Sequence, residues 1–501
     1  MRGRMAGLAL LAIATSAFAA DERVIGLSSS GAPIRAEILP GAKADAPTVL
    51  WLGGLSGPGA SSDAVERALR SARQTALSHR AVRVIAIVLA NPDAARLQFP
   101  PTGTAYRDLP EAHVLWRWIA VHAPDEVLIA DRDDAGLAQA LSAEASALIG
   151  AIPARAGVSA QQLARSARTT VPASAAHREI SRRLARSPLD LAHELAAVYG
   201  QDFTQPIYIN AIALVARLRL GELSQVQALV EPYVNGSKDS LARPSSLVLA
   251  GHMIFGELAR RTHDPRYLAR VRAAADLAFD AAGHPLEAVP YNDGFSDSVF
   301  MGSISLVQTG ALTGERRYFD MAVRHIDFMR TLDARADGLY RHQPATDAAW
   351  GRGNAFAAIG LALALSDLPP DHPGFAHLRE VFREHMQRLA QYQDPDGLWR
   401  NVIDYPGAYA EYSATAMIGF AMKRGLARGW LAPEPYEQVI ARAFEAVLAR
   451  TSDRGEFIDV CESTARMTSL DQYLHRAAIL GPDARGGAMA MLFATEMAQL
   501  P

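Results

Sequence analysis

Asp297 is the residue of this chain with the clearest potential for acid–base chemistry. It lies in a largely apolar segment, Phe295–Met301, where a helix is expected to begin. An acid among apolar residues is costly to bury unless it is hydrogen-bonded or used in a reaction, and burial that keeps it partly protonated makes a general acid. The alternative interpretation is an acid at a helix N-terminus, held there by capping and the helix dipole.

A second group of chemically capable residues follows at 340–354. Arg352 can pair with a carboxylate through two parallel hydrogen bonds, and Trp350 offers a flat apolar face to a sugar ring. His342 could hydrogen-bond a sugar hydroxyl or the Asp297 carboxyl. Each has a structural alternative: a salt bridge for Arg352, a core position for Trp350 and a satisfied buried imidazole for His342.

The elements that must position these residues are helices. From about residue 187 to 501, apolar positions recur with helical periodicity between turns such as Asn235-Gly236 and Thr313-Gly314. Thr262–Tyr267 and Thr313–Tyr318 each follow one apolar helix and open another. A repeat of about 50 residues predicts about six helical hairpins, which close into an (α/α)6 barrel whose loops surround one pocket.

The preceding part of the chain has a different pattern. Between residues 21 and 150, apolar β-rich runs such as Thr48–Leu52 and Ala81–Leu89 alternate with helical stretches, which predicts an α/β domain. Residues 151–186 are rich in Ala, Arg and Ser and show little apolar periodicity, which indicates a linker.

The first twenty residues have the features of a secretory signal peptide. Arg2 and Arg4 precede an apolar run, and Ala17-Phe18-Ala19 has the form of an export cleavage site. The apolar run is too short to span a bilayer, and we expect no membrane span later in the chain. The sequence therefore predicts an exported protein, secreted or periplasmic.

Composition restricts the class of protein further. The chain has 501 residues, of which 50% are hydrophobic, and a formal net charge of −3. Its arginines are dispersed among acids rather than grouped in a stripe, which argues against a nucleic-acid partner. Cys461 is the only cysteine, so an internal disulfide and a cysteine-rich metal cluster are both excluded.

Several segments of the helical half together resemble a known group of enzymes. They are Ser296–Met301, Tyr340–His342, Trp350–Asn354, and Gly397–Asp404 followed by Tyr409–Met417 and Lys423–Gly425. In this order and spacing they are similar to the unsaturated glucuronyl and rhamnogalacturonyl hydrolases, families 88 and 105 of the glycoside hydrolases. That resemblance implies the (α/α)6 barrel.

The resemblance also implies a reaction and a set of site residues. Asp297 would be the general acid and base that hydrates the C4=C5 double bond of a terminal unsaturated uronic acid in lyase-generated oligosaccharides, with pectin or rhamnogalacturonan products the expected substrates. No metal or cofactor is implied. The implied substrate-binding residues are Arg352, His342, Trp350, Tyr208, Asn354 and Phe356.

Two positions depart from the family pattern. Family members carry an acid in the second hairpin, where this chain has Ser245–His252 without one, and Phe356 stands where a Trp is expected. Asp293, one turn before Asp297, could compensate for the missing acid. These departures leave open a second interpretation, a glycan-binding protein without catalytic activity.

The N-terminal domain more faintly resembles the zinc carboxypeptidases. Gly31–Arg35, Trp51–Gly54, Asn91–Asp93 and Pro110–Trp118 follow the order of that fold. Ser56–Gly59 stands where the first zinc motif would fall, so the three ligands that a catalytic zinc needs are not in place. A peptidase or esterase activity remains an alternative for this domain, with Ser56 in an incomplete nucleophile elbow.

Overall fold

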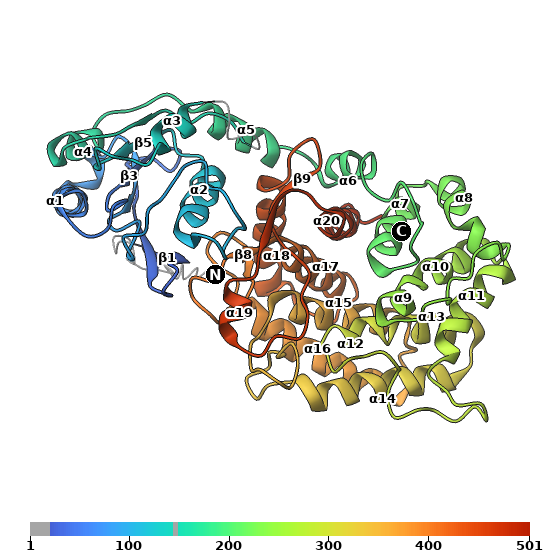
Figure 1. Cartoon of the computed structure of the whole chain (residues 1–501). Helices are drawn as coiled ribbons and strands as arrows, with labels where there is room; N and C mark the ends of the chain where they lie inside the picture. Colours follow the sequence, from blue (N-terminus) through green and yellow to red (C-terminus); the bar gives the residue numbers. More distant parts are fainter. Residues whose placement is uncertain (1–20, 144–148, 501) are drawn as a thin grey trace, which may run out of the picture.

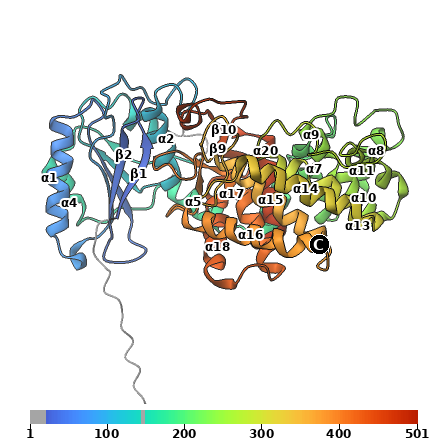
Figure 2. The same cartoon turned by 90° about the horizontal axis from the view of Figure 1, so that it is seen from below.

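The computed structural model describes residues 21–143 and 149–500, so the predicted signal peptide at 1–20 lies outside the described residues. The chain forms two lobes, an α/β domain and a larger helical domain that lie next to each other (Figures 1 and 2). In the described part of the chain, no helix is long and apolar enough to cross a membrane.

A mixed sheet forms the centre of the N-terminal domain. Its strand order is β1-β2-β4-β3-β5-β6, with β2 antiparallel to both β1 and β4 and parallel pairing from β4 through β6. The strands are β1 (Asp21–Leu27), β2 (Pro33–Leu39), β3 (Thr48–Leu52), β4 (Arg83–Ile87), β5 (Glu126–Ile129) and β6 (Ala154–Arg155). The central strands are continuous apolar runs because helices cover both faces of the sheet, which confirms the predicted α/β class.

Each face of this sheet has its own apolar core. On one face it packs against α1 (Ala60–Gln74) and α4 (Ala160–Ser166), and on the other against α2 (Pro110–His122), α3 (Leu137–Ser142) and α5 (Ala175–Leu184). A short 3-10 turn, η1 (Leu77–His79), precedes β4. The core on the α2 face does not end at the domain boundary, because it also contains Trp350, Tyr409 and Cys461 of the helical domain.

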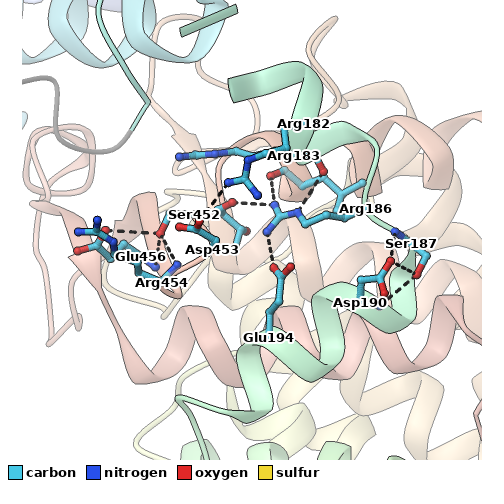
Figure 3. A network of polar contacts seen from close by, with 12 residues as sticks. Arg182, Arg183, Arg186, Ser187, Asp190, Glu194, Ser452, Asp453, Arg454 and Glu456 are labelled. Carbon is cyan, nitrogen blue, oxygen red and sulfur yellow. Dashed lines mark hydrogen bonds and ion pairs between the residues drawn. The ribbon is translucent and has the colours of Figure 1, made fainter. Parts of the chain in front are cut away.

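Residues 151–186 differ from the expected linker, because they contain β6, α4 and α5. Ser159 and Gln162 form a capping box at the start of α4, and Leu163 is buried in the core beneath the sheet. Arginines near the end of α5 then join the two domains (Figure 3). Arg186 donates hydrogen bonds to the Leu448 and Thr451 carbonyls at the end of α18 (Pro433–Ala449) and pairs with Glu194.

Helices account for most of the C-terminal domain. In addition to α18 they are α6 (Pro188–Ala196), α7 (Tyr208–Arg219), α8 (Leu223–Val234), α9 (Ser246–Gly251), α10 (Met253–Thr262), α11 (Pro265–Asp276), α12 (Ser298–Met301), α13 (Ile304–Thr313), α14 (Arg316–Asp333), α15 (Gly351–Asp367), α16 (Pro373–Gln391), α17 (Tyr412–Ala427), α19 (Leu470–Leu474) and α20 (Ala484–Met497). Two short strand pairs lie among them: β7 (Trp399–Arg400) with β8 (Ala410–Glu411), and β9 (Glu456–Cys461) with β10 (Ala478–Pro482).

The inner helices of this domain form a closed ring. Going round it, α7 contacts α9 and α10, these contact α12 and α13, and then α15, α17 and α20 follow until α20 meets α7 again. The Tyr208 and Phe356 rings, at the starts of α7 and α15, lie 5.4 Å apart, so these helices begin at the same end of the barrel. We call this end the N-terminal mouth. Asp297, immediately before α12, lies there too.

The α/β domain is attached to the N-terminal mouth by buried polar contacts. The Tyr106 ring stacks on Tyr409 with centroids 4.3 Å apart, and its hydroxyl donates to Asp459 Oδ1 over 3.0 Å. Arg117 Nη1 lies 2.6 Å from the same oxygen, and both charged side chains are about 95% buried. Because these charges are removed from water, Arg117 depends on Asp459 to offset its desolvation, and Asp459 Oδ2 also lies 3.6 Å from the buried Arg450 Nη1.

Breaking this pair is expected to destabilise the protein strongly. We predict that Asp459→Asn lowers the free energy of unfolding by about 3 kcal/mol, because Arg117 is left buried without a counter-charge. Asp453→Asn is the matched control. Its carboxylate pairs with Arg182 at a position that is 57% exposed, so its loss is expected to cost less than about 1 kcal/mol. Urea unfolding followed by circular dichroism measures both. Equal effects of the two variants would contradict the prediction.

Candidate active site

Asp297 lies at the N-terminal mouth with its carboxyl available for chemistry. It directly precedes α12 and already has helical backbone angles, but its side chain makes no capping hydrogen bond. The side chain is 16% exposed, and in the described part of the chain its Oδ1 has no hydrogen-bond partner. The capping interpretation therefore does not account for this acid.

The surroundings keep the carboxyl of Asp297 partly protonated near neutrality. Burial raises its pKa to about 7, and the positive charge of Arg352 opposes that rise. A pKa near the working pH lets a carboxyl both donate and accept a proton, which is the property required of a general acid and base. Asp297 thus has the electrostatic character that its apolar segment predicted.

Gly353 provides the space that the side chain of Ser296, the residue before Asp297, occupies. A methyl group at this position would lie 2.6 Å from Ser296 Oγ and 3.6 Å from Asp297 Oδ1. The first distance is closer than van der Waals contact allows, so a larger residue would displace the Ser296 hydroxyl next to the acid. Gly353 is thus needed for close packing of α15 against Ser296 and Asp297.

His342 points toward the acid as a neutral imidazole. Its Nε2 lies 3.9 Å from Asp297 Oδ1, and its Nδ1 is 2.7 Å from the Tyr473 hydroxyl. Burial, aided by the charge of Arg352, lowers the pKa of His342 to about 3. Burial also raises the pKa of Tyr473, so the phenol keeps its proton and can donate it to Nδ1. When the phenol donates to Nδ1, the imidazole proton lies on Nε2, which faces Asp297.

Trp350 and Arg352 lie in the same cluster but are enclosed. The Trp350 ring lies edge-on to His342, with centroids 4.6 Å apart, and the Arg352 guanidinium lies 4.8 Å from its centroid. Arg352 is 2% exposed and donates to the backbone oxygens of Cys461 and Glu462 over 2.8 and 2.9 Å. In this conformation both terminal nitrogens of the guanidinium already donate hydrogen bonds to backbone carbonyls of the protein.

The remaining predicted site residues pack beneath this cluster. Asn354 hydrogen-bonds both the N–H and the carbonyl of Tyr340, which fixes the turn that carries His342. Tyr208 and Phe356 are buried with their rings in an edge-to-face arrangement. The roles of Asn354, Tyr208 and Phe356 in substrate binding remain predictions. In the structure these residues pack at the N-terminal mouth.

Asp333 and Tyr473 are two residues of the site that sequence reasoning missed. Asp333 is the last residue of α14 and fully buried, and neither of its carboxyl oxygens has a hydrogen-bond partner among the described residues. In the sequence, only its position just before the Asp337-Gly338 turn could have marked Asp333 as a candidate site residue. Tyr473 is 131 residues from His342, so no local pattern could connect them. Asp293, which could have compensated for the missing acid, is exposed.

Two other regions were candidates for a functional site, and among the described residues neither holds a buried acid without a hydrogen-bond partner like Asp297. A cavity of about 960 Å³ lies at the opposite end of the barrel, but the charges of Arg219, Arg424 and Glu496 in its wall are paired with one another. In the N-terminal domain, Ser56 lies on an exposed turn between β3 and α1. Across 21–143 and 149–500, no three His, Cys, Asp or Glu side chains are grouped so that they could hold a metal ion.

Comparison with known proteins assigns the helical domain to a family. Residues 237–500, more than half of the chain, match the family described as Glycosyl Hydrolase Family 88. The unsaturated rhamnogalacturonyl hydrolase YesR of Bacillus subtilis is 27% identical over 204 residues, which are 38% of this chain and 56% of YesR. An unsaturated 3S-rhamnoglycuronyl hydrolase of Formosa agariphila is 33% identical over 100 residues, or 20% of this chain and 26% of that enzyme. The chain thus spans about half or less of the length of these relatives.

Solved structures agree on the fold. A possible member of the GH105 family from Salmonella enterica serovar Paratyphi A has a TM-score of 0.52 and 20% identity, and covers 64% of this chain and 94% of that one. A glycosyl hydrolase family 88 structure from Bacteroides vulgatus has a TM-score of 0.51 and 16% identity, and covers 62% and 97%. These likenesses support the (α/α)6 architecture of the helical domain; the N-terminal domain remains unassigned.

The raised pKa of Asp297 gives a testable effect on stability. A carboxyl whose folded pKa is raised stabilises the fold below its unfolded pKa, near 4, and this contribution is lost as the pH rises through the folded value of about 7. An Asn side chain does not titrate, so its contribution to the free energy of unfolding does not change over this pH range. The free energy of unfolding of Asp297→Asn, minus that of wild type, should therefore rise by about 2 to 3 kcal/mol between pH 5 and pH 8. Urea unfolding at both pH values tests this, with exposed Asp293→Asn as control; a difference that does not change with pH would refute it.

Proposed function

The chain belongs to glycoside hydrolase family 88, and from this we propose that it hydrates the C4=C5 double bond of terminal unsaturated uronic acids in lyase-generated oligosaccharides. The observation that carries the proposal is the Asp297 carboxyl, which is partly exposed, has a pKa raised to about 7 and has an oxygen free of protein partners among the described residues. We further propose products of pectin or rhamnogalacturonan lyases as substrates, because YesR bears the name of a rhamnogalacturonyl hydrolase.

The proposed reaction needs one acid that gives up a proton and then recovers it. Protonated Asp297 donates its proton to C4, and the double-bond electrons form the new C4–H bond. Positive charge then develops at C5 and on the ring oxygen. Water adds at C5 and returns a proton to the Asp297 carboxylate. The resulting hemiketal opens and releases the neighbouring sugar, so the leaving oxygen needs no second carboxylate of the kind that an ordinary glycosidase uses.

Other residues of the cluster have supporting roles in this proposal. The Nε2 proton of His342 faces Asp297, so it can stabilise the carboxylate that forms after proton transfer. The positive charge of Arg352 also favours that carboxylate. For Arg352 to bind a uronate directly, its hydrogen bonds to the Cys461 and Glu462 carbonyls would have to be exchanged for bonds to the substrate.

We propose that the N-terminal domain keeps a zinc carboxypeptidase-like fold in a supporting role. Its Asn91 side chain donates to the Leu55 carbonyl in the loop after β3, where the corresponding zinc motif would lie. Its contacts with Tyr409 and Asp459 support the N-terminal mouth from outside. We also propose that the protein is exported, on the basis of the signal-like sequence of residues 1–20.

The absorbance of the C4=C5 bond tests the function directly. We expect purified protein to abolish this absorbance in at least one lyase digest of pectin, rhamnogalacturonan or glycosaminoglycan. Asp297→Asn should reduce kcat/KM by about 100-fold or more, because the amide cannot act as an acid. Asp293→Asn, exposed and four residues away, should remain within a few-fold of wild type. No decay with any digest, or an Asp297→Asn variant nearly as active as wild type, would refute the proposal.

The pH dependence of the reaction is a separate test. Because Asp297 must be protonated to donate a proton to C4, kcat/KM should fall as the pH rises above about 7, the pKa to which burial raises this carboxyl. His342, with its pKa near 3, stays neutral across this range and should contribute no limb to the profile. Initial rates from pH 5 to 9 give the profile. A rate that continues to rise through pH 8 would contradict the assignment of Asp297 as general acid.

A further inference from the structure

Arg485 places a second positive charge at the N-terminal mouth. It is the second residue of α20, and its side chain is partly exposed. Its Nη1 donates a hydrogen bond of 3.1 Å to the Cys461 carbonyl, the same oxygen that accepts a bond of 2.8 Å from Arg352 Nη1. The two guanidinium groups are therefore neighbours, but only that of Arg352 is enclosed.

The charge of Arg485 has no counter-charge in contact with it. Glu411 lies beside the two arginines, with its Oε1 3.9 Å from Arg352 Nη1, and it is fully buried with that guanidinium. One carboxylate can balance only one of the two positive charges. Asp483, two residues before Arg485, directs its Oδ1 to the Gly486 N–H at the start of α20. Among the described residues no acid forms an ion pair with Arg485, so one positive charge at the mouth is uncompensated.

This place is unfavourable for a cation unless an anion binds there. The positive end of the α20 dipole repels a cation in the first turn of the helix, and the neighbouring Arg352 repels it too. Within the described chain, the Nε and Nη2 groups of Arg485 make no hydrogen bond, so these donors are available to a ligand. A carboxylate would relieve both repulsions and could accept two parallel hydrogen bonds from them.

Tyr208 offers a polar group in the same place. The residue is 4% exposed, and its hydroxyl has no hydrogen-bond partner in the described part of the chain. Burial raises the pKa of Tyr208, and the charges of Arg352 and Arg485 oppose that rise. The charge of Asp297 adds to it, so the phenol lies near both arginines and the acid. A hydroxyl without a protein partner in so enclosed a place suits a polar ligand.

We propose that Arg485 binds the carboxylate of the substrate's uronate and makes the site prefer an acidic sugar to a neutral one. The inference rests on the proposed function, because it names the residue that recognises that substrate class. Arg485 can bind a carboxylate without giving up its one hydrogen bond, whereas Arg352 would have to release backbone carbonyls. In this arrangement Arg352 holds the Cys461 carbonyl against which Arg485 rests.

A comparison of two substrates tests the proposal. The substrates are an unsaturated disaccharide from a lyase digest that the protein hydrates and the methyl ester of its unsaturated uronate, each followed by the C4=C5 absorbance. Wild type should prefer the acid by at least about 10-fold in kcat/KM. Arg485→Gln should lower kcat/KM for the acid by roughly 10- to 100-fold and for the ester by less than about threefold, because only the acid loses a charge-assisted hydrogen bond. An equal loss for both substrates, or a wild type without preference, would overturn the proposal.

Two further variants complete the comparison. Arg428→Gln, which removes an exposed arginine at the opposite end of the barrel, should keep the wild-type preference. If Arg485→Gln does not fold, Arg485→Lys decides: a reduced preference supports the forked contact, and an unchanged preference overturns it.

Direct binding separates this inference from the proposed function. A wild type that hydrates no digest would refute the proposed function, and calorimetric titration with galacturonate would then decide the role of Arg485. Binding that Arg485→Gln weakens about 10-fold or more, and that Arg428→Gln leaves unchanged, would support the inference. Equal binding by all three proteins, or no binding to wild type, would overturn it.

Discussion

The N-terminal mouth depends on one buried positive charge, that of Arg352. Its guanidinium connects the start of α15 to the β9–β10 hairpin through the Cys461 and Glu462 carbonyls, and to α17 through Ser413. A buried guanidinium is tolerated only where acceptors surround it, so these segments must stay together as long as it is enclosed. The same charge lowers the pKa of His342 and limits the rise at Asp297. One side chain thus fixes both the shape and the protonation of the cluster.

The α/β domain also contacts the segments that Arg352 holds together. Asp459, on the β9 strand that leads to Cys461, is held by Arg117 and Tyr106 of the α/β domain. The apolar core beneath α2 continues to Trp350 and Tyr473, which lie in the Asp297 cluster. A rearrangement at the interface would therefore be transmitted to the segment that Arg352 holds. The α/β domain is thus in contact with the part of the barrel that carries the Asp297 cluster.

The sequence predicted what local patterns can encode. Helical periodicity indicated a helical barrel after an α/β domain, and a single acid in an apolar segment indicated a carboxyl with a raised pKa at Asp297. Contacts between distant segments were not predictable: Tyr473 reaches His342 only because the β9–β10 connection folds over the mouth. The linker prediction failed for another reason. The helices at 160–184 are short and Ala-rich, so their apolar faces are narrow, yet Leu163 and the Ser159 cap suffice to fix α4.

The two ends of the barrel differ in how the acidic side chains Glu496 and Asp367, at one end, and Asp297 and Asp333, at the other, are paired. At the far end, Glu496 binds both Arg219 and Arg424, and Asp367 binds Arg260, so charge is used for stability. At the N-terminal mouth, Asp297, Asp333, Ser296 and His342 each bury at least one polar atom that, within the described chain, has no protein partner. Each such atom costs about 1–3 kcal/mol, which a fold selected only for stability would have removed. Their concentration around the one partly exposed carboxyl indicates that this end of the barrel is kept for a ligand.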